Sequence, residues 1–390
     1  MNAKRALVFL LVFLALAGSL HAGDKKKPRF YWKTATLAPD GIGWAKHMKD
    51  LIFPEMEKST RGELQVKTYW GGVMGDEEDY IKKIRIGQLQ GAGLSAQGSA
   101  QACKDIAVLE LPFLFNNYNE VDFLRVKLSN TFDELFAEQG FFLVGWIDQD
   151  FDQIYSSKYP MDKLEDFKKS RFITWYGPME EDMLRVLGAE PIPVNVPELS
   201  AAIRQGVANA SIGPAVWLVG AQLYSVVKYV NPVKIRYSPA TIIITLEAWN
   251  SLPEEYRKDF YMQRLELGWR YCNLVRKDNV KFLQAMIDYG VKEVKMDPKN
   301  YAEVEQKAKS IWPHEVGRLF DKRIYGEVVD YLAQYRAGKR LTLDDLLVMA
   351  KVDMSKPVPP EFRKRLEAMV ESNMAEFGVA SGTLVEKPAK

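Results

Sequence analysis

The sequence predicts an α/β protein of two lobes that a long helix braces. Its 390 residues are enough for two domains, because one domain typically takes about 150. Strand-like and helix-like segments alternate along most of the chain, which is typical of α/β folds with mostly parallel sheets. One segment, residues 253–289, breaks this alternation, with no proline after Pro253 and one glycine, Gly268. As a single helix it would span about 55 Å, so it would have to lie across both lobes.

Composition excludes several classes of protein. Hydrophobic residues make up 47% and charged residues 27% of the chain, which is ordinary for a globular protein and excludes disordered and collagen-like chains. A net charge of +2 lacks the broad positive field that nucleic-acid-binding proteins use, so we expect no nucleic-acid partner. Two cysteines exclude a disulfide-rich scaffold and a four-cysteine zinc site. We expect Cys103 and Cys272 to be buried thiols, although in an oxidising compartment they could also pair.

Residues 1–22 have the pattern of a secretory signal peptide. Lys4 and Arg5 precede an apolar run at 6–17, and the segment ends in a small residue, Ala22. The run is too short for a membrane-spanning helix, which needs about 20 residues. We therefore expect cleavage after Ala22 and export to the periplasm. The remaining chain has equal numbers of basic and acidic residues.

The first predicted elements follow from local patterns. Residues 30–36 are rich in aromatic and β-branched side chains and predict a strand. Apolar residues then recur at helical spacing from Trp44 to Met56, with an expected kink at Pro54. Residues 63–70 alternate between apolar and polar side chains, which predicts a half-buried strand.

The next elements keep the alternation of helix and strand. Asp76 is the expected N-cap of a helix that Gly87 ends. The predicted elements that follow are a strand at 89–94, a helix at 121–138, strands at 141–147 and 171–175, helices at 179–187 and 197–205, strands at 234–236 and 242–245, the long helix, a strand at 291–295, and helices near 301–312 and 323–335.

Motifs for catalysis are missing from the sequence. The histidines beyond the signal peptide, His47 and His314, do not lie in an H-E-x-x-H pattern, and neither G-x-S-x-G nor a P-loop occurs. Residues 91–96 match G-x-G-x-x-A, but a helix precedes them and the glycines fall inside a strand, whereas a dinucleotide site needs a strand before and a helix after. We expect no enzyme activity, no cofactor and no metal site.

Tryptophans gather near the ends of the predicted elements, at Trp44, Trp70, Trp146, Trp175 and Trp217. In open α/β sheets, ligands bind outside the carboxyl ends of the strands. Aromatic walls with a few polar groups make a small-molecule cleft. One such tryptophan alone would indicate a core position, but several at these edges together indicate a ligand cleft.

Short blocks in a fixed order resemble the solute-binding proteins of TRAP (tripartite ATP-independent periplasmic) transporters. Residues 72–77, 84–89 and 108–115 resemble that family's G-x-L-G-x-E, v-R-x-G-x-l and l-x-l-P-F-l-F blocks, and the likeness covers roughly residues 28–336. The resemblance implies two α/β lobes that close on a ligand and a long helix that braces them. It also implies delivery of the ligand to a TRAP-type membrane permease, without chemistry.

In this organisation, residues 28–155 with about 240–265 form lobe I, and residues 156–239 with about 266–338 form lobe II. Residues 339–390 look like an appended extension. It contains a proline-rich linker followed by residues 361–377, whose apolar positions predict an amphipathic helix.

One departure from the family pattern concerns the ligand. The family usually has D-L-K-G-L-K-[IV]-R, whose arginine holds the ligand carboxylate as a bidentate pair. Here residues 166–173 read DFKKSRFI, so Ile173 takes the arginine position, and Arg171 lies two residues earlier on the same strand face. The pattern is similar to a variant branch with aromatic residues after the strand, here Trp175 and Tyr176. Some members of that branch are linked to a partner of tetratricopeptide repeats.

We therefore expect a receptor for a neutral or hydrophobic small molecule. One alternative is a receptor for an organic acid, anchored by Arg171 or Arg204. Another is an assembly component that docks a periplasmic partner through residues 339–390, since a solute receptor needs no such extension. The residues expected at the ligand are Trp70, Gln97, Trp146, Ile173, Trp175, Tyr176, Asn209, Pro214 and Trp217.

Overall fold

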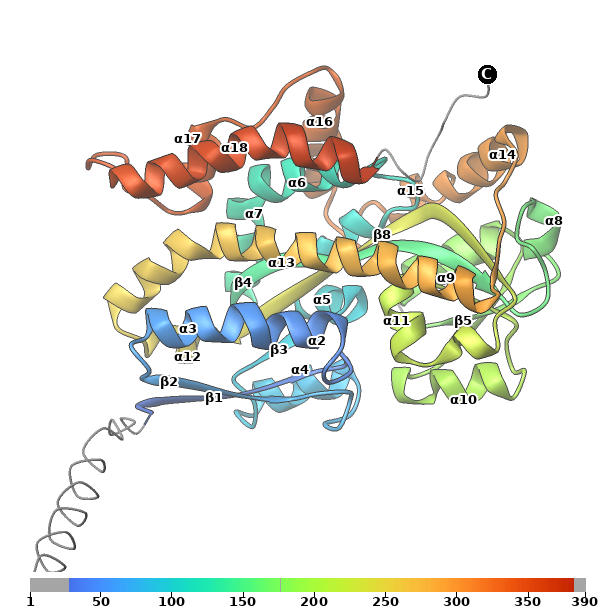
Figure 1. Cartoon of the computed structure of the whole chain (residues 1–390), viewed down its shortest axis with the longest axis horizontal. Coiled ribbons are helices and arrows are strands. Elements are labelled where there is room, and N and C mark those ends of the chain that lie inside the picture. The colour runs from blue at the N-terminus through green and yellow to red at the C-terminus, as the bar shows by residue number, and fades with distance from the viewer. Residues whose placement is uncertain (1–27, 176, 382–390) are drawn as a thin grey trace, which may run out of the picture.

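The computed structural model describes residues 28–175 and 177–381, with the side chains of 372–381 left out. The predicted signal peptide and Tyr176 lie outside the described residues. A single sheet runs through the described part of the chain, in the order β2–β1–β3–β8–β4–β7–β5–β6 with β9 beside β8 (Figure 1). The strands are β1 (Phe30–Thr36), β2 (Leu64–Tyr69), β3 (Gly91–Leu94), β4 (Phe141–Ser156), β5 (Arg171–Thr174), β6 (Glu190–Pro193), β7 (Ala210–Gly213), β8 (Tyr229–Thr245) and β9 (Lys292–Glu293).

The sheet has a first half with β2, β1 and β3 and a second half with β7, β5 and β6. The two long strands, β4 and β8, join these halves and pair antiparallel. Each is also antiparallel to its neighbour β7 or β3, whereas pairing among the short strands of each half, and between β8 and β9, is parallel. The prediction of a mostly parallel sheet is therefore wrong at its centre. The strands predicted at 141–147, 234–236 and 242–245 are parts of these two long strands, and charged residues such as Asp148 and Arg236 lie inside them. Both residues are fully buried and ion-paired.

Helices cover both faces of the sheet. In the first half they are α2 (Gly43–His47), η2 (Met48–Ile52), α3 (Phe53–Ser59), α4 (Glu77–Arg85), α5 (Ala96–Ala102), η3 (Lys104–Glu110), α6 (Tyr118–Lys127) and α7 (Ser129–Glu138). In the second half they are α8 (Leu164–Phe167), α9 (Pro178–Val186), η4 (Val196–Glu198), α10 (Leu199–Arg204), α11 (Ala215–Gly220) and η5 (Leu223–Ser225). A short helix, α12 (Leu246–Asn250), follows β8.

The helix predicted around residues 44–56, with a kink expected at Pro54, contains a π-helical segment just before that proline. The segments α2, η2 and α3 follow one another without interruption, and η2 is the π-helical part. Pro54 lies in the first turn of α3, where its missing N–H removes the ordinary hydrogen bond to the previous turn. The wider π turn just before it accommodates that loss.

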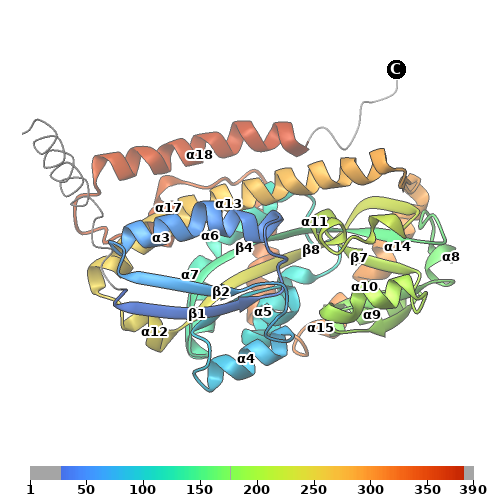
Figure 2. The ribbon, with the colours of Figure 1, turned by 60° about the horizontal axis from the view of Figure 1, so that its bottom comes forward.

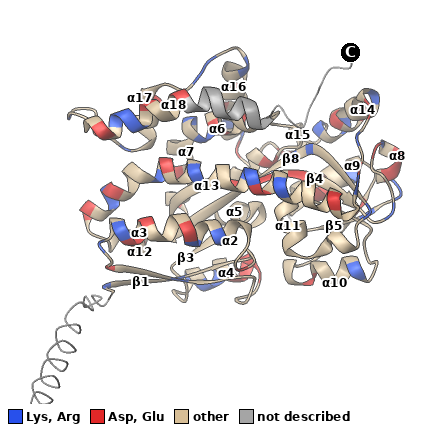
Figure 3. Cartoon of the chain, in the orientation of Figure 1, with Lys and Arg blue, Asp and Glu red and all other residues tan. Residues whose placement is uncertain are grey.

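The long helix α13 (Glu254–Tyr289) spans 36 residues and about 54 Å, which confirms the predicted brace. It packs against α2, η2 and α3 from the first half, crosses β4, and reaches α11 in the second half (Figure 1). Basic and acidic residues alternate along its exposed side (Figure 3), in keeping with the small net charge of the chain.

A buried ionic cluster holds the centre of the molecule where α13 crosses β4. Asp148 on β4 pairs with Arg125 on α6 and with Arg276 on α13. Nε of Arg276 lies 2.6 Å from Oδ2 of Asp148. Arg276 also binds both carboxylate oxygens of Asp122, at 2.7 and 2.8 Å. Tyr237 on β8 donates its hydroxyl hydrogen to Asp148 (2.6 Å). Burial opposes ionisation of Asp148, but the two guanidinium groups prevail and lower its pKa to about 2.

The C-terminal extension packs on the first half of the molecule. Beyond α14 (Pro298–Lys309), α15 (Trp312–Glu315) and α16 (Lys322–Arg336) come α17 (Leu343–Met349) and α18 (Pro360–Ser381), and α18 lies alongside α13 (Figure 2). Phe362 and Leu366 of the predicted amphipathic helix are buried against Leu265 and Val126. Their apolar face therefore covers the body of this chain.

Two details of the sequence analysis can be placed on this fold. Cys103 and Cys272 are both buried and unpaired. No described helix combines the length and the apolar character that crossing a membrane requires. The residue boundaries of the two lobes stay a prediction, and β4 and β8 pass between the halves without a break.

The ionic cluster predicts a large stability loss when one cation is removed. Arg276→Met leaves Asp122 and Asp148 short of a buried partner, and we expect a loss of about 3–5 kcal/mol in the free energy of unfolding, measured by urea denaturation. Lys258→Met is the matched control, because Lys258 pairs with Glu254 on the surface of the same helix and such pairs contribute about 0.5 kcal/mol or less. Equal losses in the two variants would contradict a central role for the cluster.

Candidate ligand-binding site

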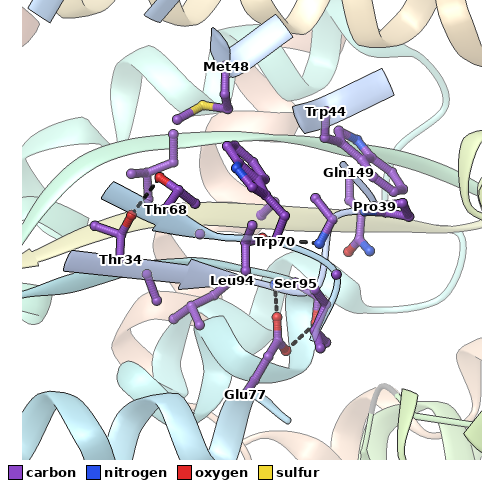
Figure 4. A pocket seen from close by; sticks show the side chains of 18 of the residues that line it. Thr34, Pro39, Trp44, Met48, Thr68, Trp70, Glu77, Leu94, Ser95 and Gln149 are labelled. Carbon is purple, nitrogen blue, oxygen red and sulfur yellow. Dashed lines mark hydrogen bonds between the residues drawn. The ribbon is translucent and has the colours of Figure 1, made fainter. Parts of the chain in front are cut away.

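A cavity of about 290 Å³ lies between the sheet and the segments α2, η2 and α3, and residues of the second half, among them Trp175 and Trp217, complete its lining. One wall consists of side chains on one face of β1, β2, β8 and β4, and the other of Trp44, Met48, Ile52, Phe53 and Met56. Figure 4 shows Trp44 and Met48 on one side of the cavity and Glu77 on the other, with Trp70 between them.

Five tryptophans line the cavity: Trp32, Trp44, Trp70, Trp175 and Trp217. The first three belong to the first half of the chain. Trp175 directly follows β5, and Trp217 lies on α11. The rings of Trp175 and Trp217 contact each other, with centroids 4.3 Å apart. The cavity is therefore built at the junction of the two halves.

Local backbone features make room for this arrangement. Gly43, at the start of α2, approaches α11 so closely that a Cβ there would lie 2.5 Å from a methyl group of Val216. Gly93 on β3 lies close to Thr36, and a Cβ there would lie 3.3 Å from the Thr36 hydroxyl oxygen. The register shifts in β4 make Val144 and Gln149 the extra residues of two bulges, and both line the cavity. Bulges commonly redirect side chains in this way.

Polar groups are few and placed at defined points. Thr34 and Thr68 share a hydrogen bond between their hydroxyl oxygens, 2.8 Å apart. Gln149 accepts the Ala96 N–H through Oε1 at 3.3 Å. The indole N–H of Trp44 is buried and has no hydrogen-bond partner among the described residues, so it remains a donor for a bound molecule.

Glu77 is the one ionisable acid among the described residues of the cavity wall. Its carboxylate accepts hydrogen bonds from Ser95 N and Oγ, both at 2.5 Å, and from Gly98 N at 2.8 Å, and thereby caps the first turn of α5. Burial raises the pKa of Glu77 to about 7, although these hydrogen bonds oppose the rise.

The described lining contains no lysine or arginine. Lys49 approaches the wall from outside: its ammonium lies 5.1 Å from the ring centroid of Trp70 and pairs with Asp40. The cavity is thus aromatic and aliphatic, with scattered hydroxyl and amide groups and one acid.

The predicted site residues divide between positions in this wall and positions outside it. Trp70, Trp175 and Trp217 line the cavity, whereas Gln97 and Pro214 do not. Gln97 lies in the first turn of α5 and faces Gly177, and Pro214 is the N-cap of α11.

Three other predicted residues also lie outside the wall. Ile173 is fully buried on β5 behind Trp175. Trp146 faces away from the cavity, because neighbouring residues of a strand point to opposite faces and Ile147 lines the cavity. The indole N–H of Trp146 donates a hydrogen bond to Tyr237 (3.1 Å). Asn209 accepts the backbone N–H of Arg171 at 3.0 Å.

Neither predicted anion anchor reaches the cavity. Arg171 is exposed and donates to the carbonyl oxygen of Gly206 at 2.9 Å. Arg204 is exposed as well and donates to the carbonyl oxygen of Gln222 at 2.7 Å. Both guanidinium groups therefore support the outer surface of the second half.

The wall also includes residues that the sequence analysis does not single out for the site. Met48, Ile52 and Met56 follow helical spacing, which in the sequence is indistinguishable from a core-facing stripe. Glu77 looks like an ordinary first-turn acid, and Gln149 depends on a bulge. The one available signal for this wall was a helical stripe of apolar residues that follows a short strand and precedes β3, a strand that contains glycine.

A two-part α/β fold with a ligand-sized cavity at the junction is the architecture of a solute-binding protein. The chain matches the model of bacterial extracellular solute-binding proteins, family 7 (DctP), over residues 36–317. It belongs to this family of TRAP-type solute-binding proteins, and so it is a binding protein and not an enzyme.

Relatives and solved structures agree with this membership. The chain is 22% identical over 292 residues to the 2,3-diketo-L-gulonate-binding periplasmic protein YiaO of Escherichia coli, covering 74% of this chain and 88% of that one. It is 24% identical over 302 residues to the C4-dicarboxylate-binding periplasmic protein DctP of Rhodobacter capsulatus, covering 75% and 88%.

Two solved structures share the fold. The sugar acid binding protein DctPAm of Advenella mimigardefordensis, in complex with galactonate, has a TM-score of 0.73 at 19% identity and covers 79% of this chain and 99% of that one. A TRAP periplasmic solute-binding protein of Sulfurospirillum deleyianum with bound succinate has a TM-score of 0.70 at 16% identity and covers 77% and 99%.

The raised pKa of Glu77 predicts a pH dependence of stability. An unfolded glutamate titrates near 4.3, whereas folded Glu77 titrates at about 7. The folded state therefore binds a proton that the unfolded state has lost, and this contribution disappears as pH rises through 7. We expect Glu77→Gln to reduce the stability difference between pH 5 and pH 8 by about 2–3 kcal/mol, measured by urea denaturation.

Glu78→Gln is the matched control, because Glu78 is the exposed neighbour of Glu77 on the same helix and pairs with Lys82. Its profile should run parallel to that of the unaltered protein. A parallel profile for Glu77→Gln as well would show that its carboxyl titrates normally.

Proposed function

We infer that this chain is the periplasmic receptor of a TRAP-type transporter and that its ligand is uncharged and largely apolar. The observation that favours this ligand is the composition of the cavity wall, which combines five tryptophans with no described lysine or arginine. The ligand would bind between the two halves of the fold and be handed to the membrane permease. Residues 1–22 would direct export and be removed.

The energetics favour a neutral ligand. A carboxylate inside this cavity would lose its hydration without a cationic partner, and such an uncompensated transfer is strongly unfavourable. It would also meet Glu77, which is partly ionised near neutral pH. An apolar ligand instead gains about 25 cal/mol for each Å² of apolar surface removed from water, and the Trp44 N–H can orient one polar group.

The position that usually holds the ligand arginine supports the same inference. Ile173 occupies it in the ungapped comparison with the family pattern and packs in one apolar cluster with Trp175 and Trp217. An arginine at this fully buried position would need an anionic partner, which a carboxylate ligand provides. Isoleucine has no such requirement, and it packs in the same apolar cluster as the indole rings of Trp175 and Trp217.

A receptor for an organic acid is the second candidate, and the relatives favour it. YiaO binds 2,3-diketo-L-gulonate, DctP binds a C4-dicarboxylate, and the two solved structures hold galactonate and succinate. In this chain an acid would need Arg171 or Arg204 to leave its backbone partner, or Lys49 to turn inward from the rim.

The extension offers one more partner surface to consider. A periplasmic partner, including one of tetratricopeptide repeats, would have to use groups other than Phe362 and Leu366, because both are buried against the body. We therefore rank partner docking below ligand binding as the main role.

A ligand screen tests the proposal. Thermal melting of the mature protein is measured with uncharged apolar compounds, including decan-1-ol and menthol, and with succinate and galactonate. We expect the uncharged compounds to raise the melting temperature, since a saturating ligand stabilises only the folded state. Trp217→Ala should then weaken binding of the same compound at least tenfold by calorimetry.

Trp146→Phe serves as the control, because Trp146 was a predicted site residue and lies outside the cavity. Its affinity should equal that of the unaltered protein. Stabilisation by the acids alone would contradict a neutral ligand and support a receptor for an organic acid. Equal effects of the two tryptophan variants would show that the ligand does not bind in this cavity.

A further inference from the structure

The cavity has two parts with different walls. Its cleft end lies at the junction of the two halves, beside Trp70, Trp175, Trp217 and Gln149. Its inner arm extends from there into the first half, between the sheet and the segments η2 and α3. The inner arm is lined by Trp32, Thr34, Ile52, Phe53, Met56, Val66, Thr68, Val144 and Ile244.

The shape of the inner arm follows from strand register. Trp32 pairs with Val66 and Thr34 with Thr68 across β1 and β2, and alternate residues of a strand face the same side. From Val66 in the inner arm to Trp70 at the cleft end, the lining of the cavity therefore follows β2 for about 13 Å at 3.3 Å per residue.

The chemistry of the inner arm is apolar along this length. Its two hydroxyl groups, on Thr34 and Thr68, bind each other. Met48 and Met56 contribute unbranched, adaptable side chains to the helical wall, which suits a flexible partner. The π-helical turn Met48–Ile52 brings both of its end residues into this wall, and such turns are frequent at functional sites.

The polar groups available to a ligand lie at the other end. Trp44, whose N–H is unpartnered among the described residues, packs against the cluster that contains Trp175 and Trp217. The bulged Gln149 and the carboxyl group of Glu77 also line the cavity. The cavity is therefore polar at its cleft end and apolar along its inner arm.

We propose that the ligand is an amphiphile with one unbranched apolar chain, which lies in the inner arm while an uncharged polar head stays among the tryptophans of the cleft end. This inference rests on the proposed function and names the ligand class for the same site. A compact ligand would fill the cleft end alone and leave the apolar walls of the inner arm without a partner.

A chain-length series tests the proposal on the mature, full-length protein. Hexan-1-ol, octan-1-ol, decan-1-ol and dodecan-1-ol are titrated by calorimetry. Each methylene group that enters the inner arm should raise the affinity about three- to fourfold, the factor for one buried CH₂. The carboxylic acids of the same chain lengths should bind at least tenfold more weakly than the alcohols.

Val66→Phe tests where the chain lies, because Val66 marks the far end of the inner arm. A phenylalanine there shortens the arm, so the affinity for dodecan-1-ol should fall at least tenfold while that for hexan-1-ol stays the same. Val66→Leu is a milder substitution that should give an intermediate loss if the larger one disturbs folding. Val329→Phe, at an exposed position of α16, is the matched control and should leave the whole series unchanged.

The outcomes separate the two inferences. Affinity that does not depend on chain length, or a Val66→Phe effect equal for all four alcohols, would overturn the extended chain while leaving the neutral-ligand receptor intact. If the alcohols fail to bind and succinate binds, the proposed function fails as well. A length-dependent series with a selective Val66→Phe loss would support both.

Discussion

The pairing of Asp148 with Arg125 and Arg276 is the interaction on which the rest of the structure depends. It joins β4, α6 and the long helix α13 at one buried point, and its charges balance because Asp122 completes the set. A strand that carries a bare aspartate into the core would be disrupted by the cost of burying it. Because Arg125 and Arg276 pair with Asp148, β4 can pass through the core from one half of the molecule to the other. The cluster thus makes a single sheet out of two α/β halves.

The cavity lies on the opposite face of β4 from the ionic cluster. Trp146 and Asp148 point into the ionic layer, whereas Ile147 and Gln149 point into the cavity. The bulges at Val144 and Gln149 shift the register between β4 and β8 and place both residues in the cavity wall. The strand therefore separates a polar, closely paired layer from an apolar space. Tyr271 on α13 lines the cavity and donates a hydrogen bond to the carbonyl oxygen of Trp44 at 3.3 Å, so the brace also holds the helical wall of the site.

Sequence patterns predicted those parts of the fold that local periodicity controls. The strand 30–36, the capped helix after Asp76 and the long helix ending at Tyr289 each show a spacing that nothing else in the chain contradicts. The full length of the long strands was not predictable in the same way, since Asp148 can be recognised as a buried strand residue only together with partners far along the chain. The site divides similarly. Trp70 and Trp175 directly follow strands and Trp217 lies on α11 soon after β7, so their places near strand ends were readable, whereas the face to which Trp146 points depends on the register of β4. Met48, Ile52 and Met56 follow a spacing typical of core, because a cavity wall and a core wall have the same pattern.

The proposal of a neutral ligand depends on how α5 is held in place. The first turn of α5 presents backbone N–H groups that need an acceptor, and Glu77 supplies it from the cavity wall. Removing the acid would leave these donors unsatisfied, so the wall retains a carboxyl group whatever ligand binds. In a fold whose relatives hold sugar acids and succinate, an anion could be accommodated beside Glu77 only with an additional cation nearby. The described wall provides none, and Ile173 stands at the position where the family pattern would place one. Since fold alone does not decide the ligand, this combination of a fixed acid and a missing cation is the physical reason to expect a neutral ligand here.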